Sequence, residues 1–398
     1  MNRIIIVGNW FDLAHGVKTS YKDFIEWYFG EVIESLRKRK NELTKRTNSE
    51  ESPIFIYEDK FMKFTYGGSI EVAIKYLDRT IFMAKGGEFL DAFMKNMTYK
   101  SYMNRTISPL FERIIKDVEN KGWVDIETDY YELLKDYALN KRGDVRQLKD
   151  YALNKRGDVK QLNEELSYIE KKLIEYLKEV ENRYFSPSPI IKTFGEEIKK
   201  MIYEDIASRD VSIKYHRLLR DKEQDKSNRV VLLNFNYTKI ADEYIENKND
   251  GFSVIHIHGK LDDEGSVIFG YGDELDNKYK EIEELNNNEF LNKIKSVKYL
   301  ERDKYRKLLY FLELEPFQVY VMGHSCGNSD RTLLNTIFEH ENCASIKLFY
   351  HKKSDGTDNF TEIVQNITRN FNDKKLLRER VVNKAYCKPL PQSEIKHG

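Results

Sequence analysis

Polar side chains that could carry out chemistry follow several short apolar runs in the second half of the chain. Amide, imidazole, hydroxyl and carboxylate groups can bind a polar ligand and transfer protons when they meet in one place. Because parallel strands end at one edge of their sheet, side chains that follow such strands meet there. The apolar runs and the polar residues behind them are 230–233 with Asn234, Asn236, Tyr237 and Thr238, 254–257 with His258, 267–269 with Asp273, and 317–322 with Ser325 and Asp330.

Two histidines, His256 and His258, are candidates for this chemistry, because strand alternation places them on one face. His258 is the better candidate, since it lies directly before Gly259, and a glycine there permits the close approach of a ligand. The alternative is that both histidines are buried and simply hydrogen-bonded. In the same way, Asn236 could close a turn and Asp330 could cap the following helix.

The sequence predicts no metal site and no structural zinc. Two histidines at positions i and i+2 could ligate a metal, but no matching third ligand is evident. The three cysteines, Cys326, Cys343 and Cys387, are widely spaced and form no C-x-x-C pair, which excludes a four-cysteine zinc module. Such cysteines favour free thiols in a reducing, cytoplasmic compartment.

A further polar segment follows the first apolar run, residues 3–7. The run predicts a buried strand, and Gly8 lets the chain turn sharply at the carboxyl end of that strand, where open α/β sheets bind their ligands. Asn9 and Asp12 place an amide and a carboxyl group at this point. One glycine is not a dinucleotide fingerprint, so an ordinary first strand with a tight turn is the alternative.

Residues 323–327 match the G-x-S-x-G motif between a predicted strand and a predicted helix. The motif suggests an α/β-hydrolase with Ser325 as the nucleophile. The order of the chain opposes this interpretation, because the acid and the histidine of such a hydrolase follow the serine after further strands. The late histidines, His340, His351 and His397, lie near the next helix and strand or in the C-terminal tail. We therefore rank a hydrolase of this class below nucleotide binding.

The composition narrows the classes of protein. In 398 residues, 66 basic side chains balance 66 acidic ones, so no overall positive field favours a nucleic-acid partner. Asp12, Asp273 and Glu274 could gather a divalent ion in a nuclease, which is a less favoured alternative. The apolar runs are far too short to span a bilayer, and no signal peptide is evident, so we expect a cytoplasmic protein without a membrane segment.

Short apolar runs that alternate with helical patterns after residue 229 predict an α/β fold. We expect a doubly wound, mostly parallel, Rossmann-like sheet that residues 3–7 join, with a large helical insertion. The predicted segments are residues 1–67, the N-terminal strand and helices of the α/β domain; 68–226, the helical insertion; 227–384, the rest of the nucleotide-binding domain; and 385–398, a loose C-terminal tail.

The predicted insertion has two internal features. Residues 134–161 are a tandem duplication of a 14-residue segment, in which only Arg146 and Lys160 differ. Residues 162–180 have apolar side chains at alternating spacings of four and three, which predicts an amphipathic helix. This helix could bind a partner protein or a second copy of the chain, but packing against the helices of its own chain is the favoured interpretation.

Taken in order, these motifs resemble the AbiH family of bacteriophage abortive-infection proteins. The resemblance spans nearly the whole chain, with the helical insertion as the variable part, and it implies an antiphage function. The chain departs from the family pattern at Trp10, where a glycine is usual. The motifs that carry the resemblance are residues 4–16, 19–24, 234–238, 256–259, 269–274, and 323–325 with Asp330.

The same set is similar, more distantly, to sirtuin-like domains of bacterial defence systems, which implies that NAD binds at the sheet edge. By this resemblance, Asn236 positions the ribose or the attacking water, and His258 is the general base. Ser325 and Asp330 hold the adenosine side. The residues implied to approach the pyrophosphate and the nicotinamide ribose are Gly8, Asn9 and Asp12. The other residues predicted to line the site are Asn234, Tyr237, Thr238, Gly259 and Gly323.

The chain departs from the sirtuin pattern, because the Gly-Ala-Gly opening is absent. The zinc cysteines are also absent, which argues against protein deacetylation and leaves hydrolysis of NAD as the simpler chemistry. The resulting hypothesis is an antiphage effector that binds and hydrolyses NAD or a related nucleotide as an NAD glycohydrolase. The alternative from another class is a non-catalytic sensor. Such a sensor would bind a nucleotide at the sheet and recognise a phage or host protein through the insertion, as a monomer or a homo-oligomer.

Overall fold

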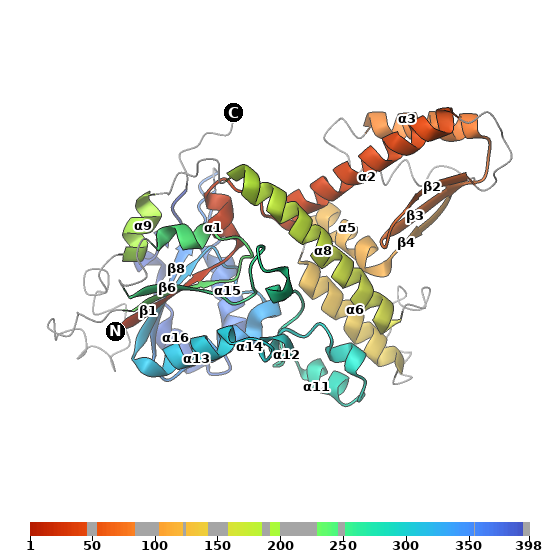
Figure 1. Cartoon of the computed structure of the whole chain (residues 1–398). Helices are drawn as coiled ribbons and strands as arrows, with labels where there is room; N and C mark the ends of the chain where they lie inside the picture. Colours follow the sequence, from red (N-terminus) through yellow and green to blue (C-terminus); the bar gives the residue numbers. More distant parts are fainter. Residues whose placement is uncertain are drawn as a thin grey trace. The chain divides into compact units, whose positions relative to one another are not determined.

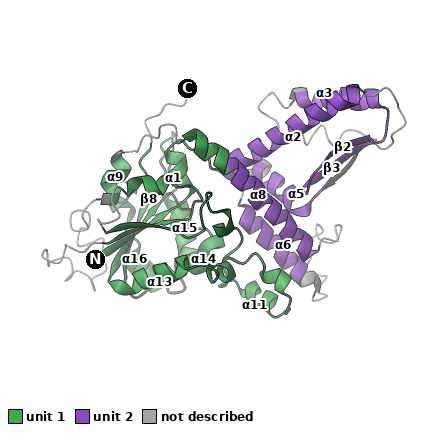
Figure 2. Ribbon diagram, in the orientation of Figure 1, with its two compact units in different colours: residues 1–19, 177–398 green, residues 20–176 purple. Residues whose placement is uncertain are grey.

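The computed structural model describes residues 1–45, 54–83, 103–121, 125–141, 158–184, 192–199, 229–245, 251–353 and 355–392. The chain divides into two compact units (Figure 2). Unit 1 contains Met1–Thr19 and Leu177–Gly398, and unit 2 contains Ser20–Tyr176. The centre of the duplication, residues 142–157, and the end of the predicted insertion, residues 200–226, lie outside the described residues.

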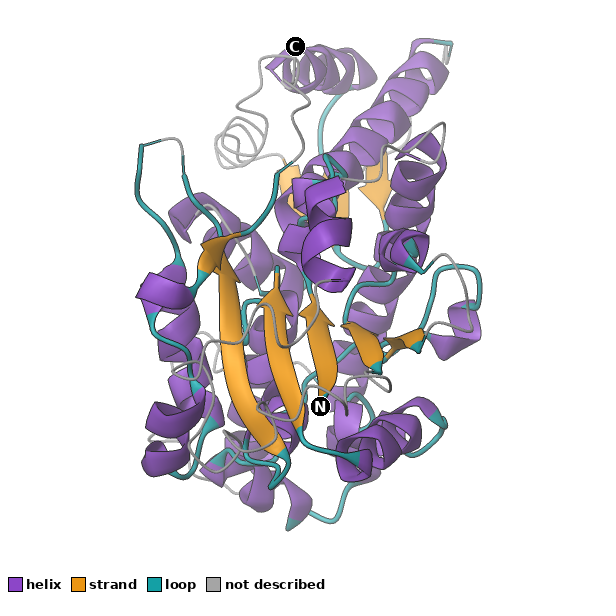
Figure 3. Cartoon of the chain, turned by 90° about the vertical axis from the view of Figure 1, so that its left-hand side faces the viewer, coloured by secondary structure: helices purple, strands orange, loops and turns teal. Residues whose placement is uncertain are grey.

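Unit 1 is built on a six-stranded parallel sheet, so the predicted α/β fold is confirmed (Figures 1 and 3). In the central strand, Ile4 pairs with Val231 on one side and with Val319 on the other. Numbered along the chain within this sheet, the strand order is 3-2-1-4-5-6, an order typical of dinucleotide-binding sheets. Across the sheet, the strands are β6 (Phe252–His256), β5 (Val230–Asn234), β1 (Asn2–Val7), β7 (Phe317–Met322), β8 (Cys343–Tyr350) and β9 (Lys388–Pro389).

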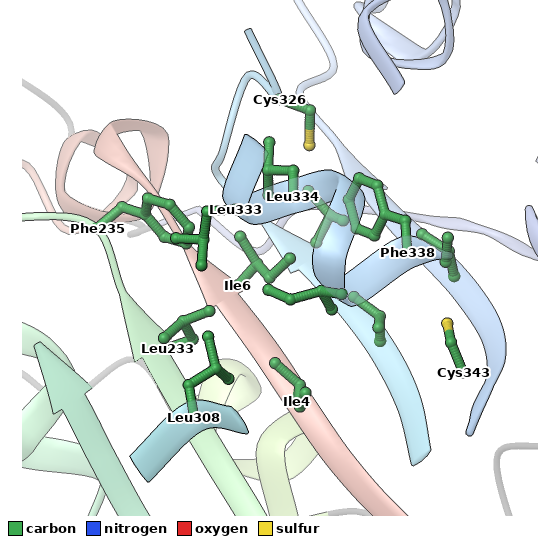
Figure 4. Packing of buried hydrophobic residues seen from close by; sticks show 14 of the residues in the cluster. Ile4, Ile6, Leu233, Phe235, Leu308, Cys326, Leu333, Leu334, Phe338 and Cys343 are labelled. Carbon is green, nitrogen blue, oxygen red and sulfur yellow. The ribbon is translucent and has the colours of Figure 1, made fainter. Parts of the chain in front are cut away.

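One face of the sheet carries the larger apolar layer. Ile4 and Ile6 of β1 point into this layer, because alternate residues of a strand share a face. Three helices cover it: α13 (Lys304–Leu314), α14 (Arg331–Phe338) and α15 (Phe360–Asn370). Figure 4 shows Leu308 of α13 and Leu333, Leu334 and Phe338 of α14 packed around these two isoleucines.

The opposite face carries a second apolar layer. Ile5 and Val7 of β1 point into it. The elements that pack there are α1 (Asn9–Ala14), α9 (Lys192–Lys199) and the 3-10 helix η5 (Ile240–Tyr244). Helices therefore lie on both faces, as a parallel sheet requires. The detailed winding of a Rossmann or sirtuin fold remains a prediction.

Unit 2 combines helices with a three-stranded antiparallel sheet that we did not predict. The strands are β2 (Ile54–Glu58), β3 (Met62–Tyr66) and β4 (Met103–Ile107), in the order β2-β3-β4. The helices are α2 (Tyr21–Thr44), α3 (Ile70–Met83), α5 (Pro109–Lys121), α6 (Ile126–Lys141) and the first part of α8 (Val159–Tyr184). Ser20 caps the start of α2, since its hydroxyl accepts a hydrogen bond from the Asp23 amide at 3.1 Å.

Asp59 fixes the turn between β2 and β3. Its Oδ1 accepts hydrogen bonds from the backbone N–H groups of Phe61 and Met62, each at 2.8 Å. Its Oδ2 accepts the hydroxyl groups of Tyr28 at 2.6 Å and Tyr57 at 2.8 Å. The carboxylate thus joins the β2–β3 turn to helix α2, which contributes Tyr28.

The amphipathic helix predicted at residues 162–180 is the central part of α8. Its apolar side chains Leu166, Ile169 and Leu173 are buried within the chain. Further along the helix, Tyr176 lies against the indole of Trp27, with ring centres 5.5 Å apart. Because this stripe is already covered, it is not an exposed surface for a partner protein.

The two units divide the chain differently from the predicted segments. Residues 20–67 belong to unit 2, whereas the sequence prediction places residues 1–67 in the α/β domain. The physical reason is that α2 packs against α3 and β2 of the same unit. Unit 1 takes only the first strand and α1 from this end of the chain.

Two smaller expectations also differ from the structure. Residues 267–269 do not form a strand of the sheet, although the Ile268 amide donates a hydrogen bond to the carbonyl oxygen of His258 at 2.9 Å. The predicted loose tail is partly ordered, because Lys388–Pro389 pair with β8 and Leu390 is buried. Burial of this apolar side chain holds the end of the chain against the sheet.

Candidate functional site

The first part of the candidate site is the turn after β5. Asn234, the last residue of β5, shapes this turn with its side chain. Its Oδ1 accepts the backbone N–H of Asn236 at 2.9 Å, and its Nδ2 donates to the carbonyl oxygen of Thr238 at 3.0 Å. Asn234 therefore holds the neighbouring side chains in place, and both of its polar atoms are used within the turn.

This turn meets the carboxyl group of Asp12, which comes from α1. Asn236 Nδ2 donates to Asp12 Oδ1 at 2.7 Å and to the carbonyl oxygen of Gly8 at 3.1 Å. The Thr238 hydroxyl donates to Asp12 Oδ2 at 2.6 Å. The structure thus brings together four of the predicted site residues, Gly8 and Asp12 from the start of the chain and Asn236 and Thr238 from more than 200 positions later.

Asp12 has an unusual acidity. The residue is only 1% exposed, and this burial raises the pKa of its carboxyl group to about 7. The hydrogen bonds from Thr238 and Asn236 lower the pKa but offset only part of this effect, and nearby Glu181 raises it further. A buried carboxyl group that titrates near neutral pH at the end of a strand is a candidate functional group.

His256 is a hydrogen-bonded core histidine. Its Nε2 lies 2.7 Å from Oδ2 of Asp242, and its Nδ1 lies 3.3 Å from Nδ2 of Asn234. Because the Asn234 amide donates to Nδ1, the proton of the ring lies on Nε2 and faces the Asp242 carboxylate. The prediction that His256 and His258 share a face is wrong: β6 ends at His256, and the two imidazoles have different partners.

The second part of the site is a buried charged network around Asp330, the residue before α14. Its Oδ1 lies 2.7 Å from Nζ of Lys295 and 3.3 Å from Nε2 of His258. Its Oδ2 lies 3.5 Å from Nε2 of His324. The hydroxyl of Tyr299 lies 3.0 Å from the same Nε2 of His258. All five side chains are buried, and the Lys295 side chain is only 1% exposed.

The neighbours of each group in this network determine its charge. Burial opposes ionisation of Asp330, but Lys295 and the hydrogen bonds from His258 and His324 outweigh burial and hold the pKa of Asp330 well below its usual range. Burial and the Lys295 ammonium lower the pKa of His258, so this imidazole is neutral at pH 7. The Cys326 amide donates to His324 Nδ1 at 2.9 Å, which places a proton on Nε2, facing Asp330.

This arrangement can support acid–base chemistry. A neutral imidazole hydrogen-bonded to an ionised carboxylate can accept a proton, and the carboxylate stabilises the imidazolium that forms. The helix-cap role considered for Asp330 is not observed, since its side chain makes no hydrogen bond to the first turn of α14. Two of the predicted site residues, His258 and Asp330, are thus in direct contact with each other.

Ser325 does not belong to this network. The residue is exposed, and its carbonyl oxygen accepts a hydrogen bond from Asn366 at 2.8 Å. Within the part of the chain that the structure describes, no histidine hydrogen-bonds to the Ser325 hydroxyl. The neighbouring Cys326 is buried, and burial raises the pKa of its thiol. The G-x-S-x-G segment thus lacks the base that a serine nucleophile needs.

The predicted glycines make close contacts within the chain itself. A Cβ on Gly8 would lie 2.5 Å from Cα of His324, and a Cβ on Gly259 would lie 2.2 Å from the carbonyl oxygen of Ser266. These close approaches within the chain explain why both positions are glycine, and the explanation needs no bound ligand. Asn9 is also used locally, because its Oδ1 accepts the hydroxyl of Thr19 at 2.6 Å.

Tyr237, another predicted site residue, is part-buried beside His258. Its hydroxyl donates to the carbonyl oxygen of Ile268 at 3.1 Å. Its ring centre lies 6.4 Å from that of His258. Tyr237 thus lines the side of the network that the segment after η6 (Glu264–Ser266) also covers.

Metal ligation finds no support in the described ranges. There, no group of three or more His, Cys, Asp or Glu side chains could hold a metal ion. Asp273, considered above as a ligand in a nuclease, instead pairs with Arg331 at 3.3 Å. All three cysteines are buried and form no disulfide.

Lys295, Tyr299 and His324 were not predicted as site residues. Lys295 and Tyr299 belong to the short helix α12 (Lys295–Tyr299), which follows no strand directly. His324 had a usable signal, because it directly follows Gly323 at the carboxyl end of β7. The sequence prediction for the turn after β7 includes Gly323 and Ser325 but not the histidine between them.

A family model described as bacteriophage abortive infection AbiH matches residues 4–352. The chain belongs to the AbiH family. The match includes both parts of the candidate site, from Asp12 to Asp330, so the family resemblance seen in the motifs is confirmed.

The AbiH chain gave no match in two other comparisons. No curated protein and no solved structure matches it. Across the described ranges of this AbiH chain, every helix is too short or too polar to cross a lipid bilayer.

Proposed function

We propose that this AbiH chain acts against bacteriophage by binding NAD, or a related nucleotide, at the carboxyl edge of its parallel sheet and hydrolysing it. The observation that carries the proposal is the buried pair of neutral His258 and ionised Asp330. The strand order of the sheet supports it, because dinucleotides bind at this edge of sheets with the same order.

In the proposed reaction, a water molecule attacks C1′ of the nicotinamide ribose. The bond between C1′ and the pyridinium nitrogen breaks, and its electron pair stays on that nitrogen, so that neutral nicotinamide leaves. The water oxygen forms the new bond to C1′, and its proton passes to His258. The products are ADP-ribose, nicotinamide and one proton.

His258 is oriented for this proton transfer. Its Nε2 faces Asp330 and Tyr299, at 3.3 Å and 3.0 Å. With the ring proton on Nε2, the Nδ1 lone pair accepts the proton from water. Among the described residues, this Nδ1 has no hydrogen-bond partner. Asp330 then stabilises the imidazolium in the same way as the acid of a catalytic triad.

Asn236 would position the ribose or the attacking water. Its Nδ2 is fixed by Asp12 and by the carbonyl oxygen of Gly8. The amide oxygen has no hydrogen bond within the described part of the chain, so it can accept one from a ribose hydroxyl or from water. Asp12 acts through Asn236 and is therefore a positioning residue.

The test is chromatographic measurement of nicotinamide released from NAD by purified protein. The wild type, His258→Gln and Asp330→Asn are compared with the control variant His340→Gln, whose imidazole pairs with Glu313 outside the site. We expect His258→Gln to lower the rate by about 10²–10⁴-fold, as for loss of a general base. The control should retain the wild-type rate and the protection against phage.

Two results would contradict the proposal. A folded His258→Gln variant with the wild-type rate would remove His258 from the reaction. If the wild type released nicotinamide neither as purified protein nor in phage-infected cells, hydrolysis of NAD itself would be rejected. Circular dichroism of each variant separates loss of activity from loss of folding.

A further inference from the structure

An exposed indole lies at the carboxyl edge of the sheet. Trp10, in the first turn of α1, is 40% exposed. Its ring stacks on the imidazole of His351, with ring centres 4.6 Å apart and 26° between the ring planes. Trp10 follows β1 and His351 follows β8, and β7 lies between these strands in the sheet. The stacked pair therefore spans the carboxyl end of β7.

The backbone on both sides holds this pair in place. The Trp10 amide donates to the carbonyl oxygen of Gly323 at 3.0 Å. Gly323 has a φ of +82°, and a Cβ there would lie 2.9 Å from the carbonyl carbon of Trp10, so the two turns are in close contact. On the other side, the His351 amide donates to Oδ1 of Asn359 at 2.7 Å.

Charged side chains of both signs lie near the pair, since the Lys353 ammonium acts on the Asp355 carboxylate and the Lys352 ammonium acts on that of Asp358. Burial and the ammonium of Lys353 lower the pKa of His351, which keeps this imidazole neutral at pH 7. Lys352 and Lys353 are both exposed and directly follow His351. A rigid indole beside ammonium groups suits a ligand that has a planar ring and a phosphate group.

We propose that Trp10 and His351 form a platform on which a planar ring of a nucleotide stacks, with Lys353 close to its phosphate. The proposal rests on the proposed function, because it assigns a binding contact to the same nucleotide. The two places are linked through consecutive residues: Gly323 binds the Trp10 backbone, and His324 contacts Asp330.

The test is isothermal titration calorimetry with four ligands: NAD, nicotinamide mononucleotide, AMP and ribose 5-phosphate. The affinities of the wild type, Trp10→Leu and Trp10→Phe are compared, and Tyr310→Leu is the control variant. Tyr310 is an exposed aromatic residue of α13, with 66% of its surface accessible. The titrations are run under conditions in which NAD is not consumed, or with His258→Gln as the background.

We expect Trp10→Leu to weaken the binding of NAD by about 10-fold or more, the effect of losing one stacked base. Trp10→Phe should lose less, because a smaller aromatic ring remains. Ribose 5-phosphate has no ring to stack, so its affinity should not depend on Trp10. Whichever of nicotinamide mononucleotide and AMP loses more affinity identifies the ring on the platform.

The outcomes separate this inference from the proposed hydrolysis. Wild-type affinity of folded Trp10→Leu for all three ring-containing ligands would overturn the platform and leave the proposed hydrolysis standing. Binding that depends on Trp10 without any release of nicotinamide would support the platform and contradict hydrolysis. If none of the nucleotides bound to the wild type, both would be overturned.

Discussion

The acidity of Asp12 gives the stability of the protein a distinct dependence on pH. The pKa of its carboxyl group is about 7 in the folded protein, against a reference value of 3.8. The folded state therefore binds this proton more tightly than the unfolded state does. The resulting stability is fully present below about pH 4, falls as the pH rises, and is lost above about pH 7.

The variant Asp12→Asn should remove this dependence. One pKa unit corresponds to about 1.4 kcal/mol, so the rise from 3.8 to about 7 is worth roughly 4 kcal/mol of unfolding free energy. The wild type has lost this stability at pH 8, whereas a neutral asparagine keeps it. An asparagine keeps the local hydrogen bonds. Its Oδ1 accepts from Asn236, and its Nδ2 donates to the Thr238 hydroxyl, which turns to accept.

The assay is thermal unfolding of the wild type and Asp12→Asn between pH 4.5 and pH 8.5. The control is Asp262→Asn, which alters an exposed aspartate of the same unit. At about 2 °C per kcal/mol for a unit of this size, Asp12→Asn should unfold roughly 8 °C above the wild type at pH 8 and close to it at pH 4.5. A difference that does not change with pH, or a less stable variant at pH 8, would refute the argument.

Two further predictions concern the packing around the site. Gly323→Ala should destabilise unit 1 strongly, because the new Cβ would lie 2.2 Å from the Phe11 amide nitrogen. Gly356 has a similar φ of +85°, but no atom lies near the position of its Cβ, so Gly356→Ala should lower the free energy of unfolding by only about 1–2 kcal/mol. Equal losses in thermal unfolding would contradict this steric explanation. Lys295→Met leaves ionised Asp330 buried without its cation and should cost about 3–5 kcal/mol in denaturant unfolding. The double variant Lys295→Met/Asp330→Leu should recover part of that loss, and simple additivity would speak against the pairing.

The sheet of unit 1 could be predicted because its strands are continuous apolar runs that end in glycine or polar residues. Both faces of a parallel sheet are covered, so such strands need no polar alternation. The antiparallel sheet of unit 2 was missed for a related reason. Ile54 and Ile56 alternate with exposed Phe55, but this signal covers only five residues beside a polar stretch.

The candidate site was predictable only where its residues follow strands. Asn236 and His258 each lie two residues beyond the end of their strands, β5 and β6, and the convergence of parallel strand ends places them at one edge. Lys295 reaches the network from α12 and is buried only because tertiary packing carries that helix onto Asp330. No local pattern marks a lysine for burial, since lysines are mostly exposed.

The place of β1 in the sheet has a consequence for how the protein is made. Val7 pairs with Asn234, so about 220 residues, including all of unit 2, are synthesised before the first neighbour of this strand exists. At about 5–20 residues per second, this largely apolar strand remains on the order of 10–45 s without a partner strand. A nascent chain with this arrangement can complete unit 2 first and needs protection of its first strand, by chaperones or the ribosome surface, until β5 emerges.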